Sequence, residues 1–179
     1  TGDLELVKQL EDNIERALNW IDEYGDRDGD LFVEYHQESQ KGIANQGWKD
    51  SGDSVVHRNG DFAKSPIALC EVQGYVYQAK KGISTIYGAL GYGDKAEALD
   101  EQAERLKKEF NHVFWMEDVE FYAIALDEHK QQVGTITSNP GHLLQSGILS
   151  NDRAKKIANK IVNKNMFSGY GIRTMSKGE

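Results

Sequence analysis

The chain has little cysteine: among its 179 residues there is one, Cys70. A single thiol excludes a disulfide within the chain and sets it apart from small disulfide-stabilised secreted domains. This usage fits a reducing compartment, and we expect a cytoplasmic location. Cys70 follows the apolar residues 67–69, which favours a buried structural thiol, because reactive cysteines need an exposed and electropositive setting.

Positive charge is also scarce. The 21 lysine and arginine residues are outnumbered by 29 aspartate and glutamate residues, which leaves a formal net charge of −8. Nucleic acids and anionic membranes select basic surfaces, so we expect neither as a partner. No apolar run approaches the length of about 20 residues that a membrane-spanning helix needs. With 39% hydrophobic residues, the chain has the composition of a globular domain of ordinary size.

Apolar residues repeat at helical spacing in several segments. Ser65-Pro66, Asp94 and Ser150 provide helix starts, since Ser and Asp cap helices and Pro suits the first turn. Gly91 provides a stop. The predicted helices cover residues 7–21, 66–90, 94–113, 140–148 and 151–162.

One segment near residues 120–136 predicts a short β-hairpin. Residues 121–126 and 131–136 have the length of short strands, and the polar residues 127–130 between them favour a turn. Amphipathic helices joined in pairs predict a mainly α fold of stacked antiparallel hairpins. The long polar loop 26–62 and the glycine-rich tail would then meet at one end, where we expect a site.

The loop 45–54 concentrates side chains that suit a carbohydrate. Trp48 offers a flat apolar face, and Lys49, Asp50 and Asp53 follow it closely. A glycosidase needs a carboxylic acid that stays protonated near neutral pH and protonates the leaving oxygen. Trp48 could supply an apolar wall beside Asp50, and Asp53 could favour its protonated form by repulsion, whereas Lys49 would oppose this if it pointed inward. A solvated turn with a packed tryptophan is the alternative.

Four further polar residues have two interpretations each. Glu71 and Gln73, near the start of the predicted helix 66–90, either point into the same pocket or simply suit a helix N-terminus. His142 either bonds a sugar hydroxyl or serves as a structural donor, and no second histidine lies at zinc-binding spacing. Arg173 either pairs with a site carboxylate or braces its own loop.

The segment of Asp26, Asp28 and Asp30 begins like a calcium loop. An EF-hand also needs glycine at its sixth position and glutamate at its twelfth, and here those positions hold Leu31 and Gln37. A polar turn is therefore the favoured interpretation, with calcium as the alternative. We expect no metal and no cofactor.

Five segments of the chain match motifs that occur together in one enzyme family. They are Tyr24–Gly29 (YGDRDG), Asn45–Ser51 (NQGWKDS), Pro66–Tyr77 (PIALCEVQGYVY), Ser138–Leu144 (SNPGHLL) and Phe167–Thr174 (FSGYGIRT). Together they resemble the bacterial glycogen debranching enzymes, the amylo-alpha-1,6-glucosidase-like family of glycoside hydrolases. The segments occur in the family's order and cover most of the chain.

This resemblance implies part of an (α/α)6 toroid that hydrolyses α-glucosidic bonds with inversion. It places the general acid on Asp50. More distant toroid enzymes carry the aspartate directly after the tryptophan, where this chain has Lys49, so Asp53 is the alternative or supporting acid. The resemblance also implies which residues line the sugar subsites or support the acid: Gln46, Trp48, Lys49, Glu71, Gln73, Tyr75, Asn139, His142 and Arg173.

The family's general base is a glutamate in a segment that follows the one around Arg173. Full-length members are longer and carry an N-terminal β-rich domain. We therefore expect residues 1–179 to form one incomplete domain from the middle of the toroid, inactive without the remainder of its own polypeptide. The alternative functions are a non-catalytic carbohydrate-binding module and a helical interaction module, both built on the same toroid.

Overall fold

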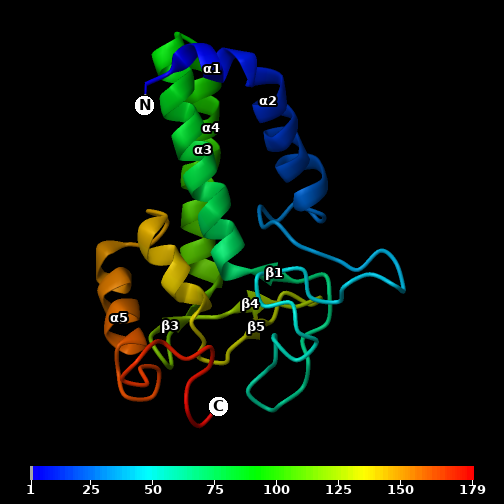
Figure 1. Cartoon of the computed structure of the whole chain (residues 1–179), viewed down its shortest axis with the longest axis vertical. Coiled ribbons are helices and arrows are strands. Elements are labelled where there is room, and N and C mark those ends of the chain that lie inside the picture. Colours follow the sequence, from blue (N-terminus) through cyan, green and yellow to red (C-terminus); the bar gives the residue numbers. More distant parts are fainter. Residues whose placement is uncertain (1) are drawn as a thin grey trace.

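The computed structural model describes residues 2–179 and has a mainly helical fold with two small antiparallel sheets (Figure 1). The helices are α1 (Leu4–Gln9), α2 (Glu11–Trp20), the π-helix η1 (Ile21–Gly25), α3 (Cys70–Leu90), α4 (Gly93–Val113), the 3-10 helix η2 (Asn139–Gln145) and α5 (Asn151–Ile161). The strands are β1 (Ala68–Leu69), β2 (Trp115–Met116), β3 (Phe121–Tyr122), β4 (Ala125–Leu126) and β5 (Gln132–Val133). The predicted mainly α fold with a short hairpin is confirmed.

Helices α3 and α4 form a long antiparallel hairpin, with α1 across its upper end and α2 beside it (Figure 1). Gly91 ends α3 with a φ of 84°, a left-handed conformation that glycine reaches without steric cost. Helix α4 buries Leu99, Ala103, Leu106 and Phe110 at the predicted three- and four-residue spacing. The hairpin therefore brings the start of α3 and the end of α4 to the same end of the molecule.

Helix α3 starts later than its sequence predicts. The predicted start at Ser65-Pro66 is wrong, because Ile67 instead pairs with Tyr35 in an antiparallel bridge and Ala68–Leu69 pairs with β4. This strand pairing keeps the backbone extended until Leu69, whose ψ of 139° marks the last non-helical residue. The apolar run from Ile67 thus serves the sheet first and the helix afterwards.

The predicted cap of α4 is also displaced. Tyr92 takes the N-cap position, and Asp94 lies in the first turn of α4 and not at its cap. A carboxylate in the first turn still complements the partial positive charge of a helix N-terminus. The predicted cap of α5 is confirmed, because Ser150 accepts a hydrogen bond from the backbone N–H of Arg153 at 3.4 Å.

The sheet beside the helices has the order β1-β4-β5, and Ala125 lies opposite both Leu69 and Val133. The predicted hairpin corresponds to β4 and β5. Residues 121–122 do not continue it; they pair with β2 in a second sheet, with Trp115 opposite Tyr122. Because β3 pairs with the nearby strand β2, the second edge of β4 is available to pair with β1.

A cluster of aromatic rings joins the helical hairpin to these sheets. Phe110 of α4 stacks on Phe114 at 4.6 Å and on Tyr122 of β3 at 5.2 Å between ring centroids. Phe32 meets Phe114 edge-on at 5.1 Å. These rings are almost fully buried, so the loop 26–62 takes part in the same core as α4 and β3.

The N-terminal arm packs loosely. The predicted helix 7–21 is divided at Leu10, which ends α1 and caps α2, and neither helix contains a buried residue. Ion pairs tie the arm to the hairpin, between Lys80 and Asp22 at 2.6 Å and between Lys95 and Glu11 at 3.3 Å. Within residues 2–179, no helix combines the length and apolarity that crossing a bilayer requires.

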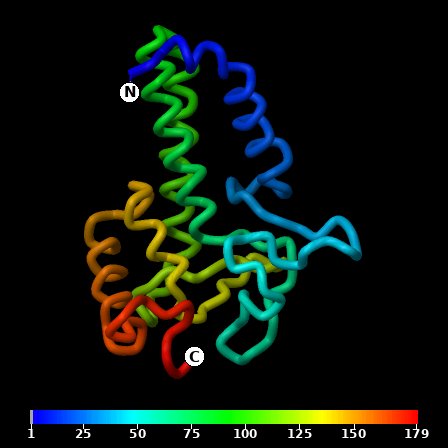
Figure 2. The backbone as a smooth tube through the Cα atoms, viewed as in Figure 1, coloured from blue at the N-terminus to red at the C-terminus, as the bar shows by residue number. Residues whose placement is uncertain are grey.

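The loops and the C-terminal segment gather at the end of the molecule opposite the α3–α4 turn (Figure 2). Helix η2 ends at Gln145, shorter than the predicted 140–148, because Gly147 adopts a φ of 82° and turns the chain. Residues 137 and 175 form an antiparallel bridge that draws the tail against the start of η2. This end of the molecule carries the predicted site residues.

Candidate functional site

The loop 45–54 is held in shape by its own polar residues. Asn45 is buried; it accepts a hydrogen bond from Tyr35 Oη at 2.9 Å and donates from Nδ2 to the Ser51 carbonyl at 2.7 Å. Ser54 Oγ donates to the Lys49 carbonyl at 2.7 Å. These bonds bend residues 45–54 into a compact turn that leaves Trp48 and Asp50 exposed.

Gly47 lets this loop approach the end of β1. A Cβ atom built on Gly47 would lie 2.4 Å from Leu69 Cδ1, far inside van der Waals contact. A residue with a side chain at position 47 would displace Leu69 or lift the loop. The glycine therefore seats Trp48 beside the N-terminal turn of α3.

Trp48 forms an aromatic cluster with two residues from other elements. The Trp48 and His142 rings lie 5.5 Å apart between centroids at an angle of 41°. Tyr75 Oη and His142 Nδ1 lie 2.7 Å apart at hydrogen-bond distance. Trp48 and Tyr75 remain 53% and 41% exposed, so both offer ring surface to a ligand. The loop, α3 and η2 thus meet at one exposed aromatic surface.

Lys49 turns toward the C-terminal segment. Its Nζ donates to the Thr174 carbonyl at 2.8 Å and lies 5.1 Å from the centroid of the Trp48 ring. Burial lowers the pKa of Lys49, and the negative charge of Glu71 partly opposes that change. The lysine therefore braces the loop from the side and joins it to the tail.

Glu71 is a fully buried carboxylate beneath this surface. Its Oε1 accepts a hydrogen bond from Asn139 Nδ2 at 2.8 Å, and its Oε2 accepts a weak one from Cys70 Sγ at 3.4 Å. Burial, with the charge of Glu71 second, raises the pKa of Tyr75 and of Cys70. The Cys70 thiol therefore stays protonated, which fits its expected structural role.

Asp50 and Asp53 line a shallow cavity of about 400 Å³ together with Trp48, Lys49 and Thr174. Both carboxylates are exposed. Among the residues the structure describes, none forms a hydrogen bond or an ion pair with either carboxylate. Both groups are free to meet a ligand from the solvent side, and the geometry of residues 2–179 does not separate them.

Two predicted site residues, Gln73 and Gln46, form hydrogen bonds with the backbone in this structure. Gln73 is fully buried; its amide donates to the carbonyls of Val33 and Leu69 and accepts from Val33 N at 2.9 Å. Gln46 Nε2 donates to the His36 carbonyl at 3.1 Å. These contacts give Gln73 and Gln46 the task of positioning loops, while Gln46 remains exposed.

Arg173 lies at the base of the tail, where its backbone N–H donates to the Met166 carbonyl at 2.7 Å. Its Nε is buried without a hydrogen-bond partner among residues 2–179. Thr174 and Asn45, which touch or shape the site, were not predicted as site residues. Thr174 lies in the motif FSGYGIRT and Asn45 in NQGWKDS, so their membership of these motifs could have identified them as site residues.

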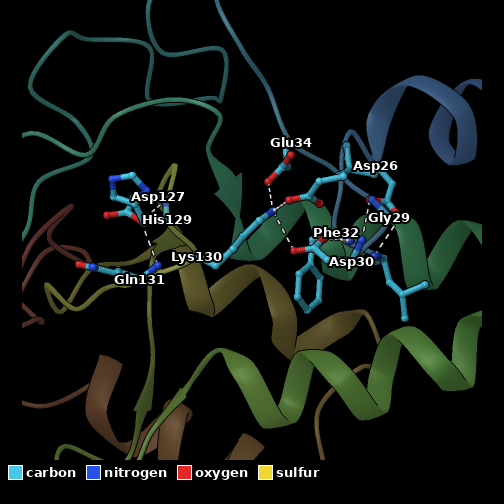
Figure 3. A network of polar contacts seen from close by, with 12 residues as sticks. Asp26, Gly29, Asp30, Phe32, Glu34, Asp127, His129, Lys130 and Gln131 are labelled. Carbon is cyan, nitrogen blue, oxygen red and sulfur yellow. Dashed lines mark hydrogen bonds and ion pairs between the residues drawn. The ribbon is translucent and has the colours of Figure 1, made fainter.

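The aspartates of residues 26–30 form a separate polar cluster (Figure 3). Ligand oxygens of Asp26, Asp28 and Asp30 lie within 4.8 Å of one another, a spacing that a metal ion could use. Lys130 of the β4–β5 turn already pairs with this cluster, at 2.9 Å from Asp28 and 2.8 Å from Asp30, and it also contacts Glu34.

The oxygens of Asp26 are also occupied. They accept backbone hydrogen bonds from Gly29, Asp30 and Leu31, at 2.9, 3.1 and 2.9 Å (Figure 3). The backbone is therefore wound around Asp26, and the Lys130 ammonium lies among the other carboxylates. Calcium would have to displace that ammonium, so the donor set fits a lysine better than a metal ion.

Comparison with known proteins adds a family and a fold. A family model described as amylo-alpha-1,6-glucosidase matches residues 30–179. No curated protein matches the chain. A solved structure described as a sialidase superposes with a TM-score of 0.74 at 14% identity, over 100% of this chain and 15% of that one. At that identity the likeness concerns the fold alone, and the chain spans about 15% of the length of that sialidase.

Proposed function

The chain belongs to the amylo-alpha-1,6-glucosidase family, and from that premise we propose that it forms one wall of the active site of an enzyme that hydrolyses α-glucosidic bonds. The observation that carries the proposal is the position of Trp48, which lines one cavity with Asp50 and lies beside His142 of η2, itself at hydrogen-bond distance from Tyr75 of α3. An aromatic face with a carboxyl group and hydrogen-bonding side chains suits a sugar ring. The coarser class, a glycoside hydrolase-type domain, follows from the family.

In the proposed reaction Asp50 is the general acid. It donates its proton to the glycosidic oxygen as the bond to the anomeric carbon breaks, and the leaving glucan departs as an alcohol. Trp48 supports a sugar ring from beside the acid. Substrate that covers the exposed Asp50 would remove it from water and favour its protonated form until the proton is transferred.

The other proposed site residues position these groups. Tyr75 and His142 present hydrogen-bonding atoms beside Trp48, while Lys49 fixes the loop to Thr174. The buried hydrogen bond between Asn139 and Glu71 joins η2 to α3 and so helps to position His142 and Tyr75. Gln46 and Gln73 hold the surrounding backbone segments through hydrogen bonds from their side-chain amides to main-chain carbonyls. Arg173 lines the site beside the tail.

An inverting reaction needs a second carboxylate that activates water on the opposite face of the sugar. Such a base lies about 6.5–9.5 Å from the acid. We place it on a segment outside these 179 residues, as the family resemblance implies. The proposal therefore includes the rest of an (α/α)6 toroid, and the present chain alone is expected to be inactive.

The test is Asp50→Asn in the natural full-length protein, with Asp53→Asn beside it. Removing the acid's proton should lower kcat on α-1,6-linked glucosides by roughly a hundredfold or more. Asp53→Asn should have a smaller effect. Turnover by Asp50→Asn near the wild-type value would contradict the assignment, and a selective loss in Asp53→Asn would transfer the acid role to Asp53.

A carbohydrate-binding module without catalysis is the second candidate. It is favoured by the exposure of Asp50, whose carboxyl group forms no hydrogen bond or ion pair within residues 2–179. Titration of tryptophan fluorescence with maltooligosaccharides separates the two functions. Binding that persists in Asp50→Asn, in a wild-type protein that hydrolyses no α-glucoside, would establish the module.

A further inference from the structure

A second cavity in residues 2–179 lies away from the Asp50 loop. It measures about 580 Å³, a volume typical of small-ligand sites, and it shares no lining residue with the cavity at Asp50. Two segments supply most of its lining: residues 57–64, which form its first wall, and residues 127–134 around the β4–β5 turn, which form its second wall. Met116 and Asp118 complete the lining. The loop at Asp50 leads directly into the first wall.

The first wall is a hairpin-like turn that is shaped before any ligand binds. Val56 and Phe62 pair in an antiparallel bridge. Asn59 Nδ2 donates to Asp61 Oδ2 at 2.7 Å, and Asn59 Oδ1 accepts from the Asp61 backbone N–H at 3.0 Å. Gly60 closes the turn with a φ of 89°. A preformed wall keeps the entropic cost of binding low.

The second wall is anchored to the first. Arg58 Nε donates to the Gly134 carbonyl at 2.8 Å, and its Nη1 donates to Asp118 at 3.1 Å. The buried Asp127 accepts backbone hydrogen bonds from His129 and Gln131, each at 2.9 Å (Figure 3). Its other oxygen lies 3.3 Å from His57 Nε2. The two walls therefore hold a fixed separation.

The charges in the cavity are paired within its own walls. Arg58 pairs with Asp118, and Lys64 pairs with Glu128 at 3.8 Å. Paired cations leave little attraction for a phosphate, and the acids are likewise engaged with lysine, arginine, histidine, asparagine or backbone donors. The remaining groups are hydrogen-bonding amide and imidazole side chains. This lining suits a neutral ligand with many hydroxyl groups.

Phe62 supplies the apolar part of such a site. It lines the cavity, yet 62% of its surface is exposed, which is unusual for a phenylalanine in a folded protein. One face of a glucose ring carries C–H groups that pack against an aromatic ring, while its rim of hydroxyls bonds to polar neighbours. Phe62 with Asn59, Asp61 and Gln131 offers both kinds of contact.

We propose that this cavity is a second carbohydrate-binding site, which holds a glucan chain outside the catalytic groove. The ligand class follows from the lining. The choice of an α-glucan as the sugar rests on the proposed function. Because residues 45–54 and 55–64 are adjoining loops, a chain bound here stays tethered near the Asp50 loop, which would raise its local concentration there.

The experiment uses affinity electrophoresis of the natural full-length protein in gels that contain glycogen. Two independent variants target the cavity: Phe62→Ala removes the aromatic face, and Gln131→Trp fills the space. Each should weaken retention by glycogen at least about tenfold in apparent Kd. Tyr24→Ala is the matched control, because Tyr24 is an aromatic residue with 64% exposure that does not line the cavity.

Retention that falls in both cavity variants and stays at the wild-type level in Tyr24→Ala supports the second site. Wild-type retention in Phe62→Ala and Gln131→Trp overturns it, as does a wild-type protein that glycogen does not retain. Hydrolysis by the wild-type protein is measured separately. Phe62-dependent retention without hydrolysis would leave this site standing and remove the proposed catalytic function.

Discussion

Lys130 neutralises acidic groups that are far from it in sequence. It contacts Asp28, Asp30 and Glu34 from the turn between β4 and β5 (Figure 3). Partial burial lowers the pKa of Lys130, but hydrogen bonds to these three carboxylates outweigh it and raise the pKa overall. Burial raises the pKa of Asp30 and of Glu34. The charged lysine therefore offsets part of the cost of burying these carboxylates.

These titrating groups make the free energy of unfolding depend on pH. Because the pKa of Lys130 is raised on folding, its contribution to stability is complete below the ordinary lysine value of about 10.4 and is lost as pH rises through the raised value. Asp30 and Glu34 have raised pKa values, so folding favours their protonated forms as pH falls toward about 4.

Replacing Lys130 by methionine keeps the chain length and removes the charge. We expect the free energy of unfolding to fall by about 1–3 kcal/mol near neutral pH, because Glu34 and Asp30 then lose their main counter-charge. The difference from wild type should shrink between about pH 7 and pH 4, as those carboxylates take up protons. Urea unfolding at several pH values measures both effects.

Lys41→Met is the control, since Lys41 is exposed and lies outside this cluster. It should change the free energy of unfolding by less than about 0.5 kcal/mol at any of these pH values. A Lys130 variant whose destabilisation is the same at all pH values would show that lost packing, and not lost charge, is responsible.

At the scale of elements, the contact between α3 and η2 decides how the site is assembled. A Cβ atom on Gly74 would lie 2.8 Å from Leu143 Cδ2 and 3.3 Å from Ser146 Oγ. The glycine thus lets η2 lie directly on α3. This close approach places Asn139 against Glu71 and His142 against Tyr75.

Gly74→Ala should therefore destabilise the protein although alanine favours helices. Overpacking at this contact is expected to cost about 1–3 kcal/mol in the free energy of unfolding. Gly82→Ala in the same helix is the matched control: its added Cβ meets no atom within 4 Å, so it should stabilise by about 0.5–1 kcal/mol. Urea unfolding of both variants checks the difference, and equal effects would contradict the packing argument.

At the scale of the whole molecule, one aromatic cluster joins the helical hairpin to the loop region. Phe110 lies at its centre, stacked on Phe114 of the same chain segment and on Tyr122 of β3. The candidate site is formed by the loop 45–54, α3 and η2, and both α3 and η2 bury residues in the core that contains this cluster. The relative placement of those elements therefore depends on the cluster staying packed.

Truncation of Phe110 to alanine should lower the free energy of unfolding by about 3–5 kcal/mol, the range for a large aromatic removed from a core. Phe167→Ala, at a position 42% exposed, should cost clearly less. Thermal unfolding followed by far- and near-ultraviolet circular dichroism measures the loss. A Phe110 variant as stable as the Phe167 variant would show that the two parts of the molecule are held together elsewhere.

Local periodicity was enough to predict most of the secondary structure. The long helices α3 and α4, the capped helix α5 and the β4–β5 hairpin follow from apolar spacing and turn residues that act within a few positions. The errors fall where distant segments intervene. Pro66 does not begin a helix because β1 pairs with β4, more than fifty residues later.

In the candidate site too, local sequence patterns predicted some features, and contacts between distant segments determined the others. The composition of residues 45–54 marked Trp48 and Asp50 as a sugar-contacting pair, and that assignment stays a prediction until Asp50→Asn is measured. The neighbours of the loop, however, come from η2 and the tail. No local pattern relates Lys49 to Thr174, because their contact depends on how the chain folds back.

By itself the amino-acid sequence determined the mainly helical fold, the family and the loop of the proposed acid, because these depend on local spacing and on short motifs. Only the tertiary structure decided that the Gln73 amide bonds the backbone of Val33. It also placed Lys130 among the aspartates for which calcium was the alternative ligand. It also decided that a second cavity opens beside Phe62. The physical reason is that burial, charge pairing and cavity shape arise only when segments distant in sequence come into contact.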